Sequence, residues 1–133
     1  MRVLIDTNIL ISSVLGHGTP FRAYMKAVTF PNQGLVCAQN VDEMRRIFNR
    51  KFPKRIPDME RFLSLALQTL ELVHVPEEPV QQEQAIRDEN DRPILRAAIK
   101  AQADILLTGD KDFLESGLEY PHIVTAAEFC DMN

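Results

Sequence analysis

Residues 1–8 constrain the fold of this chain more than any other stretch. Residues 3–5 form an unbroken apolar run, which is typical of a strand buried on both faces of a parallel sheet. Asp6 ends the run, and residues 9–15 have an apolar pattern compatible with a helix. Open α/β sheets bind their ligands at the carboxyl ends of such strands. The alternative is that Asp6 or Thr7 only caps the following helix.

Further short apolar runs alternate with helical patterns along the whole chain. We expect further strands over residues 35–38, 72–75, 103–108 and 122–124, and helices from Thr19 or Pro20, from about residue 41, from residue 57, after Asp91 and over 126–131. Because strands that alternate with helices form parallel sheets with both faces covered, we predict an α/β fold in one domain, residues 1–133.

Composition excludes several classes of protein. The net charge of −4 argues against a protein that coats nucleic acid, although a local basic patch fits it. Cys37 and Cys130 have no nearby Cys or His that would predict a zinc motif, and they indicate reduced thiols. No signal peptide or membrane span is predicted, so we expect a cytoplasmic protein that does not bind membranes.

Four acidic residues follow predicted strands or begin the next helices: Asp6, Glu43, Asp91 and Asp110. Because these positions share one edge of a parallel sheet, we expect the four carboxylates to converge. Each one also has a simpler explanation. Asn40 and Glu43 match a capping box, and Asp91 and Asp110 fit the N-cap position of a helix.

Four carboxylates at one edge would repel one another, so a divalent cation is the natural counter-charge. Oxygen ligands favour Mg²⁺ or Mn²⁺ over zinc, and such a site suits the hydrolysis of a phosphodiester. The histidines His17, His74 and His122 lie in a turn and in two predicted strands, and we interpret them as structural or surface residues.

Other polar residues surround these positions. Asp88 and Asp112 stand near stronger candidates and could hold a second cation or be solvated. Asn8 and Thr108 lie at the same sheet edge and are suited to orient a metal ligand. A basic cluster follows Glu43 and could contact an RNA backbone or form a solvated helix face; it comprises Arg45, Arg46, Arg50, Lys51, Lys54 and Arg55.

These residues resemble, in order, the successive motifs of PIN-domain proteins, and most closely those of the VapC-like toxins. The motifs are Asp6-Thr7-Asn8, Glu43, Asp91 with Ile94, Leu95, Ala97 and Ala98, and the segment from Thr108 to Phe113. The resemblance implies a three-layer α/β/α sandwich around a parallel sheet. It also implies a Mg²⁺- or Mn²⁺-dependent endoribonuclease, a homodimer, and an antitoxin protein as partner.

The family's metal-binding acids carry over to Asp6, Glu43, Asp91 and Asp110, with Asp112 as a candidate fifth. Ala38 departs from the family pattern, which often has a small hydroxyl residue before the helix that carries the Glu, so the local cap is in question.

Two other functions fit parts of the sequence. A haloacid-dehalogenase-like phosphatase also begins with an Asp after a buried strand, but its second Asp would fall at Asn8 and its phosphate-binding Lys has no counterpart here. A PIN-like module that binds RNA or protein without catalysis is the other alternative, and the presence of all four acids argues against it.

Overall fold

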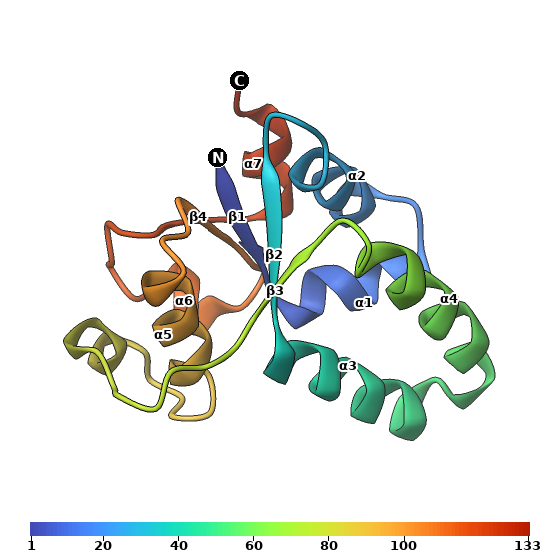
Figure 1. The fold of residues 1–133 in the computed structure, drawn as a ribbon, viewed down its shortest axis with the longest axis horizontal. Helices are drawn as coiled ribbons and strands as arrows, with labels where there is room; N and C mark the ends of the chain where they lie inside the picture. The colour runs from blue at the N-terminus through green and yellow to red at the C-terminus, as the bar shows by residue number, and fades with distance from the viewer.

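The computed structural model describes residues 1–133 as a single parallel sheet with helices on both faces (Figure 1). The strands are β1 (Arg2–Ile5), β2 (Gln33–Cys37), β3 (Glu71–Val73), β4 (Ile105–Leu107) and β5 (His122–Val124). The helices are α1 (Thr7–Leu15), α2 (Thr19–Ala27), α3 (Ala38–Lys51), α4 (Ile56–Ala66), α5 (Arg92–Lys100), α6 (Lys111–Leu114) and α7 (Ala126–Asp131), with 3-10 turns over Pro53–Arg55 and Gln81–Ala85.

The sheet has the strand order β3-β2-β1-β4-β5, and every pair of neighbouring strands is parallel. This order places β1 in the middle, which explains why its sequence is apolar at successive positions. Val3 and Ile5 pack into the core on one face of the sheet, and Leu4 packs into the core on the other. The predicted buried central strand is confirmed.

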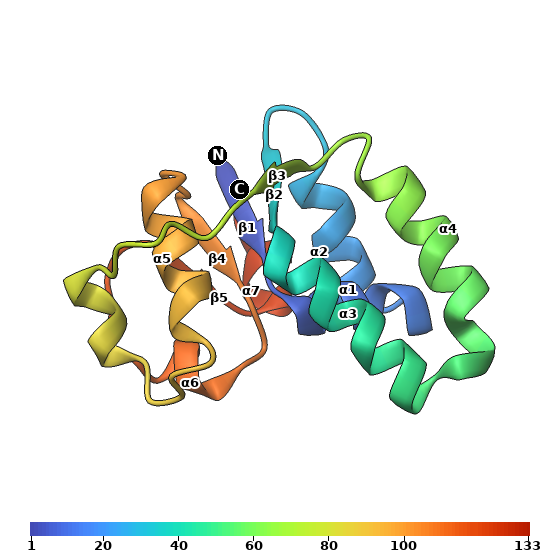
Figure 2. The same ribbon diagram turned by 60° about the horizontal axis from the view of Figure 1, so that its bottom comes forward.

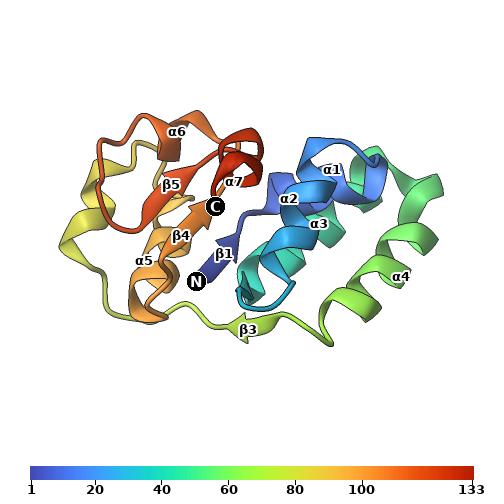
Figure 3. The same ribbon diagram turned by 90° about the horizontal axis from the view of Figure 1, so that it is seen from above.

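Two helical layers enclose the sheet, as Figure 3 shows from above. Residues of α1, α2, α3, α4 and α7 form the larger apolar core on one face. Residues of α5 and α6, together with Ile86, form a smaller core on the other face. The predicted α/β/α sandwich is therefore confirmed. No helix combines the length and the apolar character needed to cross a membrane.

The start of α3 differs from the sequence prediction. The helix begins at Ala38 rather than near residue 41, and Cys37 is its N-cap without a side-chain hydrogen bond. The predicted capping box of Asn40 and Glu43 is therefore wrong, since both residues lie inside the helix. Asn40 is buried there and points to the end of β1. The suspected lack of a capping side chain near Ala38 is confirmed.

The order in which strands are added to the sheet reverses at its middle. The chain after β1 proceeds to β2 on one side, and β4 pairs with the other side of β1. Figure 2 shows α3 and α5 on opposite sides of these strands. The segments that follow β1 and β4 therefore meet at a topological switch point, where α/β sheets bind ligands.

Candidate active site

Asp6 is at the centre of this switch point. It directly follows β1 and is the N-cap of α1, where its Oδ1 accepts a hydrogen bond from the backbone N–H of Thr7 at 2.8 Å. Its other oxygen, Oδ2, accepts from Thr108 Oγ1 at 2.7 Å and from Asn8 Nδ2 at 3.2 Å. The side chain is therefore fixed from three sides, and the cap alternative for Asp6 describes only one of its contacts.

Thr108 and Asn8 connect the ends of β1 and β4. The hydroxyl of Thr108 donates to Asp6 and accepts from the backbone N–H of Asp110 at 3.0 Å. Asn8 accepts from the backbone N–H of Gly109 at 3.0 Å while its amide donates to Asp6. Thr108 and Asn8 thus bind the side chain of Asp6 and also the backbone at Gly109 and Asp110. These contacts fit the orienting role that their sequence positions predict.

The four acids that the sequence singles out line one cavity of ≈ 180 Å³, with Thr7, Asn8, Ile11 and Ile47 as the other lining residues. Glu43 enters from the second turn of α3. Asp91 comes from the loop before α5, and it is the N-cap residue of that helix but makes no capping hydrogen bond. Asp110 does cap α6, since it accepts from the backbone N–H of Asp112 at 2.9 Å.

Burial and the charges of neighbouring acids raise the pKa of two carboxyl groups that line this cavity. The pKa of Asp6 is raised to about 6, chiefly by burial and to a smaller extent by the charges of Glu43 and Asp110, while hydrogen bonds from Thr108 and Thr7 lower it. Burial also raises the pKa of Asp91 to about 7, with added contributions from Asp110, Asp88 and Asp6. No Lys, Arg or His lines the cavity, so no residue of the lining neutralises these carboxylates when they are ionised.

The two weaker acidic candidates lie beside this cavity and do not line it. Carboxylate oxygens of Asp88, Asp91 and Asp112 all lie within 4.8 Å of one another. Asp112 is already paired with Arg87, whose guanidinium nitrogens lie 2.9 and 3.1 Å from Oδ1. Asp88 is exposed and accepts from the backbone N–H of Asn90. Asp91 is the residue that the two acidic groups share.

The basic cluster separates into paired and unpaired residues. Arg45 forms an ion pair with Glu60 at 2.9 Å, and Arg55 forms one with Asp58 at 2.7 Å. The others are exposed and have no carboxylate within 4.0 Å, namely Arg46, Arg50, Lys51 and Lys54. Only these four are free to contact a phosphate backbone without losing an existing ion pair.

Sequence reasoning missed two polar residues of the site. Asn40 is buried, and its Nδ2 lies 3.5 Å from Asp6 Oδ1 and 3.4 Å from the carbonyl of Ile5. Its spacing of three residues from Glu43 could have identified it as a neighbour on the same helix face. The sequence offers Thr7 as a cap and as a member of the Asp6-Thr7-Asn8 motif, without a role of its own in the site, whereas it is the first residue of α1 and lines the cavity.

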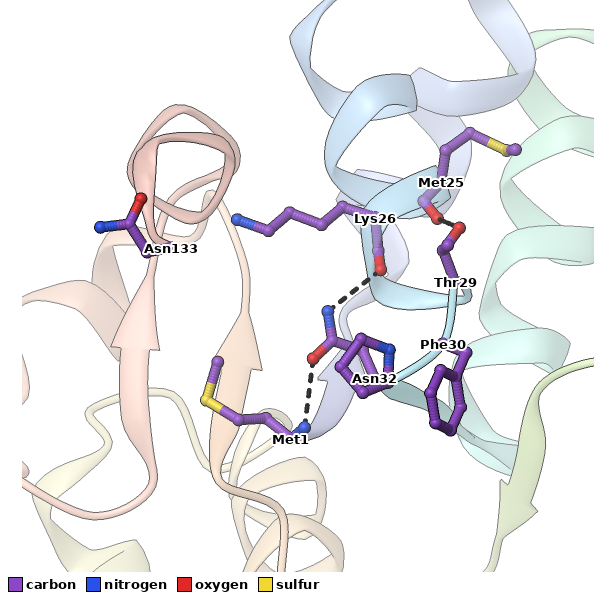
Figure 4. A pocket seen from close by; sticks show the side chains of 8 residues that line it. Met1, Met25, Lys26, Thr29, Phe30, Asn32 and Asn133 are labelled. Carbon is purple, nitrogen blue, oxygen red and sulfur yellow. Dashed lines mark hydrogen bonds between the residues drawn. The ribbon is translucent and has the colours of Figure 1, made fainter.

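Two larger cavities have different linings. One, of ≈ 370 Å³, lies at the amino end of the strands and includes Met25, Lys26 and Phe30 (Figure 4). The other, of ≈ 390 Å³, lies among α1, α2 and α4, and its one acid, Asp58, is paired with Arg55. Neither gathers several carboxylates. The three histidines are all exposed and lie outside the acidic cavity, as expected.

The fold is similar to two solved structures. One is the crystal structure of VapBC2 from Rickettsia felis bound to a DNA fragment from their promoter, with a TM-score of 0.70 and 17% identity over 94% of this chain and 98% of that chain. The other is VapC20 from Mycobacterium tuberculosis, with a TM-score of 0.64 and 18% identity over 87% of this chain and 95% of that chain. The TM-scores show a shared fold, and at such low identity the similarity shows the fold alone.

No curated protein has a sequence that matches this chain. The family model described as PIN domain does match it, over residues 2–112. That range covers β1 to β4 and all four acids of the cavity, and it is most of the chain. The protein therefore belongs to the PIN-domain family.

Proposed function

We propose that this protein is a Mg²⁺- or Mn²⁺-dependent endoribonuclease. The observation that carries the proposal is the convergence of Asp6, Glu43, Asp91 and Asp110 on one cavity at the switch point of the sheet. Membership in the PIN-domain family supports the same conclusion. The catalytic role of each of these residues is part of the proposal.

The donor set fits a hard divalent cation. The cavity is lined by carboxylate, amide and hydroxyl oxygens, and no Cys or His takes part. Thr7 is one of the lining residues, and its hydroxyl oxygen is buried without a hydrogen-bond partner. The four lining acids would hold the cation, and Asp112 is a candidate fifth ligand. When bound, the cation would polarise the phosphate of the RNA and activate a water molecule for attack.

The protein's own residues would orient the acids and bind the substrate. Thr108 and Asn8 keep the Asp6 carboxylate in place through hydrogen bonds to its Oδ2, and Asn40 approaches its Oδ1. Arg46 and Arg50 follow Glu43 at helical spacing on α3, so they extend the face that lines the cavity. We infer that they contact RNA phosphates, with Lys51 and Lys54 further along the same surface.

We further propose that the protein is the toxin of a toxin–antitoxin pair. Among the proteins that share its fold, VapC20 is described as a toxin that cleaves the Sarcin-Ricin loop, and VapBC2 is a complex bound to promoter DNA. An antitoxin partner, a homodimer and a location in the cytoplasm are the corresponding expectations for this chain.

The two alternatives are less well supported. A phosphatase of the haloacid-dehalogenase type needs a Lys at its phosphate, and no Lys or Arg lines the cavity. A PIN-like module that only binds RNA or protein has no need for four acids in one cavity, where burial and the neighbouring acids raise the pKa of Asp6 and Asp91. An assay of RNA cleavage distinguishes the non-catalytic PIN-like module from the proposed endoribonuclease.

The test is cleavage of structured and unstructured RNA by the purified protein, with Mn²⁺ or with EDTA. We expect cleavage only with the cation, and a loss of ~100-fold or more in Asp6→Asn and Asp91→Asn. Asp131→Asn makes the same chemical change at an exposed position of α7 and should cleave like the wild type. Cleavage that persists in both variants and in EDTA would refute the proposal.

A further inference from the structure

Thr7 carries a buried hydroxyl that no group of the protein satisfies. The residue is 3% exposed, and its Oγ1 is the only buried side-chain polar atom without a hydrogen-bond partner. An unsatisfied buried hydroxyl destabilises a folded protein, so native structures rarely keep one without a purpose. Because Thr7 lines the acidic cavity, the missing partner is expected to come from there.

A role in capping α1 does not explain this hydroxyl. The N-cap of the helix is Asp6, and the backbone N–H of Thr7 already donates to its Oδ1. The contrast with Ser13 on the same helix is clear, since that buried hydroxyl donates to the carbonyl of Ile9 at 2.7 Å. α1 therefore satisfies the buried hydroxyl of Ser13 and leaves unsatisfied that of Thr7, which is the residue of the two that lines the acidic cavity.

We propose that Thr7 is a positioning residue of the cation site. Its hydroxyl gains a hydrogen bond to an oxygen atom of the shell around the cation when the cation binds. This inference rests on the proposed metal-dependent function and adds one residue to it. A hydroxyl can donate to a carboxylate and accept from a water, so it is suited to either kind of oxygen in such a shell.

The test measures Mn²⁺ affinity by calorimetric titration, and thermal unfolding in EDTA, for variants of Thr7. Thr7→Val replaces the hydroxyl by a methyl group of similar size, and Thr7→Ala removes the hydroxyl in a second way. Both should bind Mn²⁺ ~10- to 100-fold more weakly, as loss of a partner around a metal site does. Thr7→Ser keeps the hydroxyl and should bind within ~3-fold of the wild type.

Unfolding in EDTA should rank the variants in the opposite order. Thr7→Val removes an unsatisfied polar atom without leaving a cavity, so its melting temperature should equal or exceed that of the wild type. Thr7→Ser deletes a buried methyl group and should melt ~4 °C lower. A residue with only a structural role cannot give weaker cation binding in the more stable variant and normal binding in the less stable one.

Ser13→Ala is the matched control, because it removes a buried hydroxyl from the same helix at a position outside the acidic cavity. It should lower the melting temperature and leave Mn²⁺ affinity unchanged. If Thr7→Val fails to fold, Thr7→Ala decides the question.

Two results would overturn the inference while leaving the proposed function intact: Thr7→Val and Thr7→Ala bind Mn²⁺ as tightly as the wild type, or Thr7→Ser loses as much affinity as Thr7→Val. A wild-type protein that does not bind Mn²⁺ would instead overturn the proposed function, and this inference with it.

Discussion

Asp6 and Asp91 line the same cavity, but their carboxylates are held in different ways. Both oxygens of Asp6 accept hydrogen bonds, from the backbone N–H of Thr7 on one side and from Thr108 Oγ1 on the other. Asp91 makes no capping hydrogen bond, and burial together with the neighbouring Asp110 raises its pKa. Replacement by Asn should therefore stabilise the metal-free protein less at Asp6, where hydrogen bonds are lost, than at Asp91.

We expect Asp6→Asn to gain no stability in EDTA at pH 7, because lost hydrogen bonds worth ~1–3 kcal/mol offset the removal of a buried charge. The NH2 group of the new Asn side chain would point its hydrogens at N–H or O–H groups that now donate to an oxygen of Asp6. Asp91→Asn relieves repulsion from Asp110 and should melt no lower than the wild type. Thermal unfolding of the two variants side by side measures this difference. Equal melting temperatures for both would mean that the two carboxylates have similar surroundings after all.

At this scale, the sequence predicted which acids gather and two of the residues that hold Asp6, namely Asn8 and Thr108, but not Asn40. Each of the four follows a predicted strand or begins the next helix, so their convergence follows from the parallel sheet alone. The position of Asn40 depends on where α3 begins, and a start three residues earlier turns it from a cap into a buried neighbour of Asp6. The local sequence around Asn40 is compatible with a cap position and with a position inside the helix. Only the tertiary fold decides between the two.

At the scale of elements, α3 connects the acidic cavity to the basic cluster. Glu43 and Ile47 line the cavity from this helix. Arg46 and Arg50 follow Glu43 by three and seven residues, so they share its side of the helix. At 1.5 Å per residue, Arg50 is ~10 Å further along the axis than Glu43. The helix thus places exposed positive charge beside the acids without bringing it into the cavity.

Replacement of the four unpaired basic residues by Gln should weaken RNA binding and reduce its salt dependence. The expected reduction in the slope of log K against log salt is ~0.7 for each lost phosphate contact on single-stranded RNA. Measurements of RNA affinity over a range of salt concentrations would show it. The variants are Arg46→Gln, Arg50→Gln, Lys51→Gln and Lys54→Gln, made singly and together.

The paired arginines supply the control for this experiment. Arg45→Gln loses an exposed ion pair with Glu60, which is worth ~0–1 kcal/mol, and should leave the salt slope nearly unchanged. A combined variant of the four unpaired residues with the wild-type slope would show that the cluster is only a solvated helix face, which is the alternative that the sequence left open.

The segment between β3 and α5 contains an element that the sequence did not predict, the 3-10 turn over Gln81–Ala85. The helices and short strands follow from apolar periodicity, and the structure has them all. The 3-10 turn over Gln81–Ala85 has no such pattern, since it is held by the buried pair of Arg96 with Glu83. Arg96 also donates to the carbonyl of Pro76. An ion pair between residues 13 apart cannot be read from the sequence, because many other charged residues are equally close.

On the scale of the whole molecule, two sets of carboxyl groups oppose each other in their effect on stability. Hydrogen bonds lower the pKa of Glu71, Glu83 and Glu128, chiefly those from Arg2, from Arg96 and from the backbone of Thr125. These groups stabilise the fold above their unfolded pKa, and the contribution is lost as pH falls. Asp6 and Asp91 have a raised pKa, so the folded state binds more protons than the unfolded chain and loses stability as pH rises from about 4 to 7.

The metal-free protein should therefore be most stable at about pH 4–5, where both sets of groups are near their favourable state. For Asp6 alone, a pKa raised from 3.8 to about 6 corresponds to ~3 kcal/mol lost by pH 7. A cation that binds the deprotonated acids removes this loss, and protons compete with it at lower pH.

Mn²⁺ at a hundredfold excess over its dissociation constant should add ~2.7 kcal/mol at pH 7, which is ~10 °C in melting temperature for a domain of this size. The gain should be much smaller at pH 5, so the cation moves the stability maximum toward neutral pH. Melting curves at both pH values, with Mn²⁺ and with EDTA, measure this shift. Asp91→Asn should be less sensitive to pH without the cation and gain less from it, because it lacks both the titrating group and the ligand. If all four acids were only helix caps, wild type and variant would melt alike and Mn²⁺ would change neither.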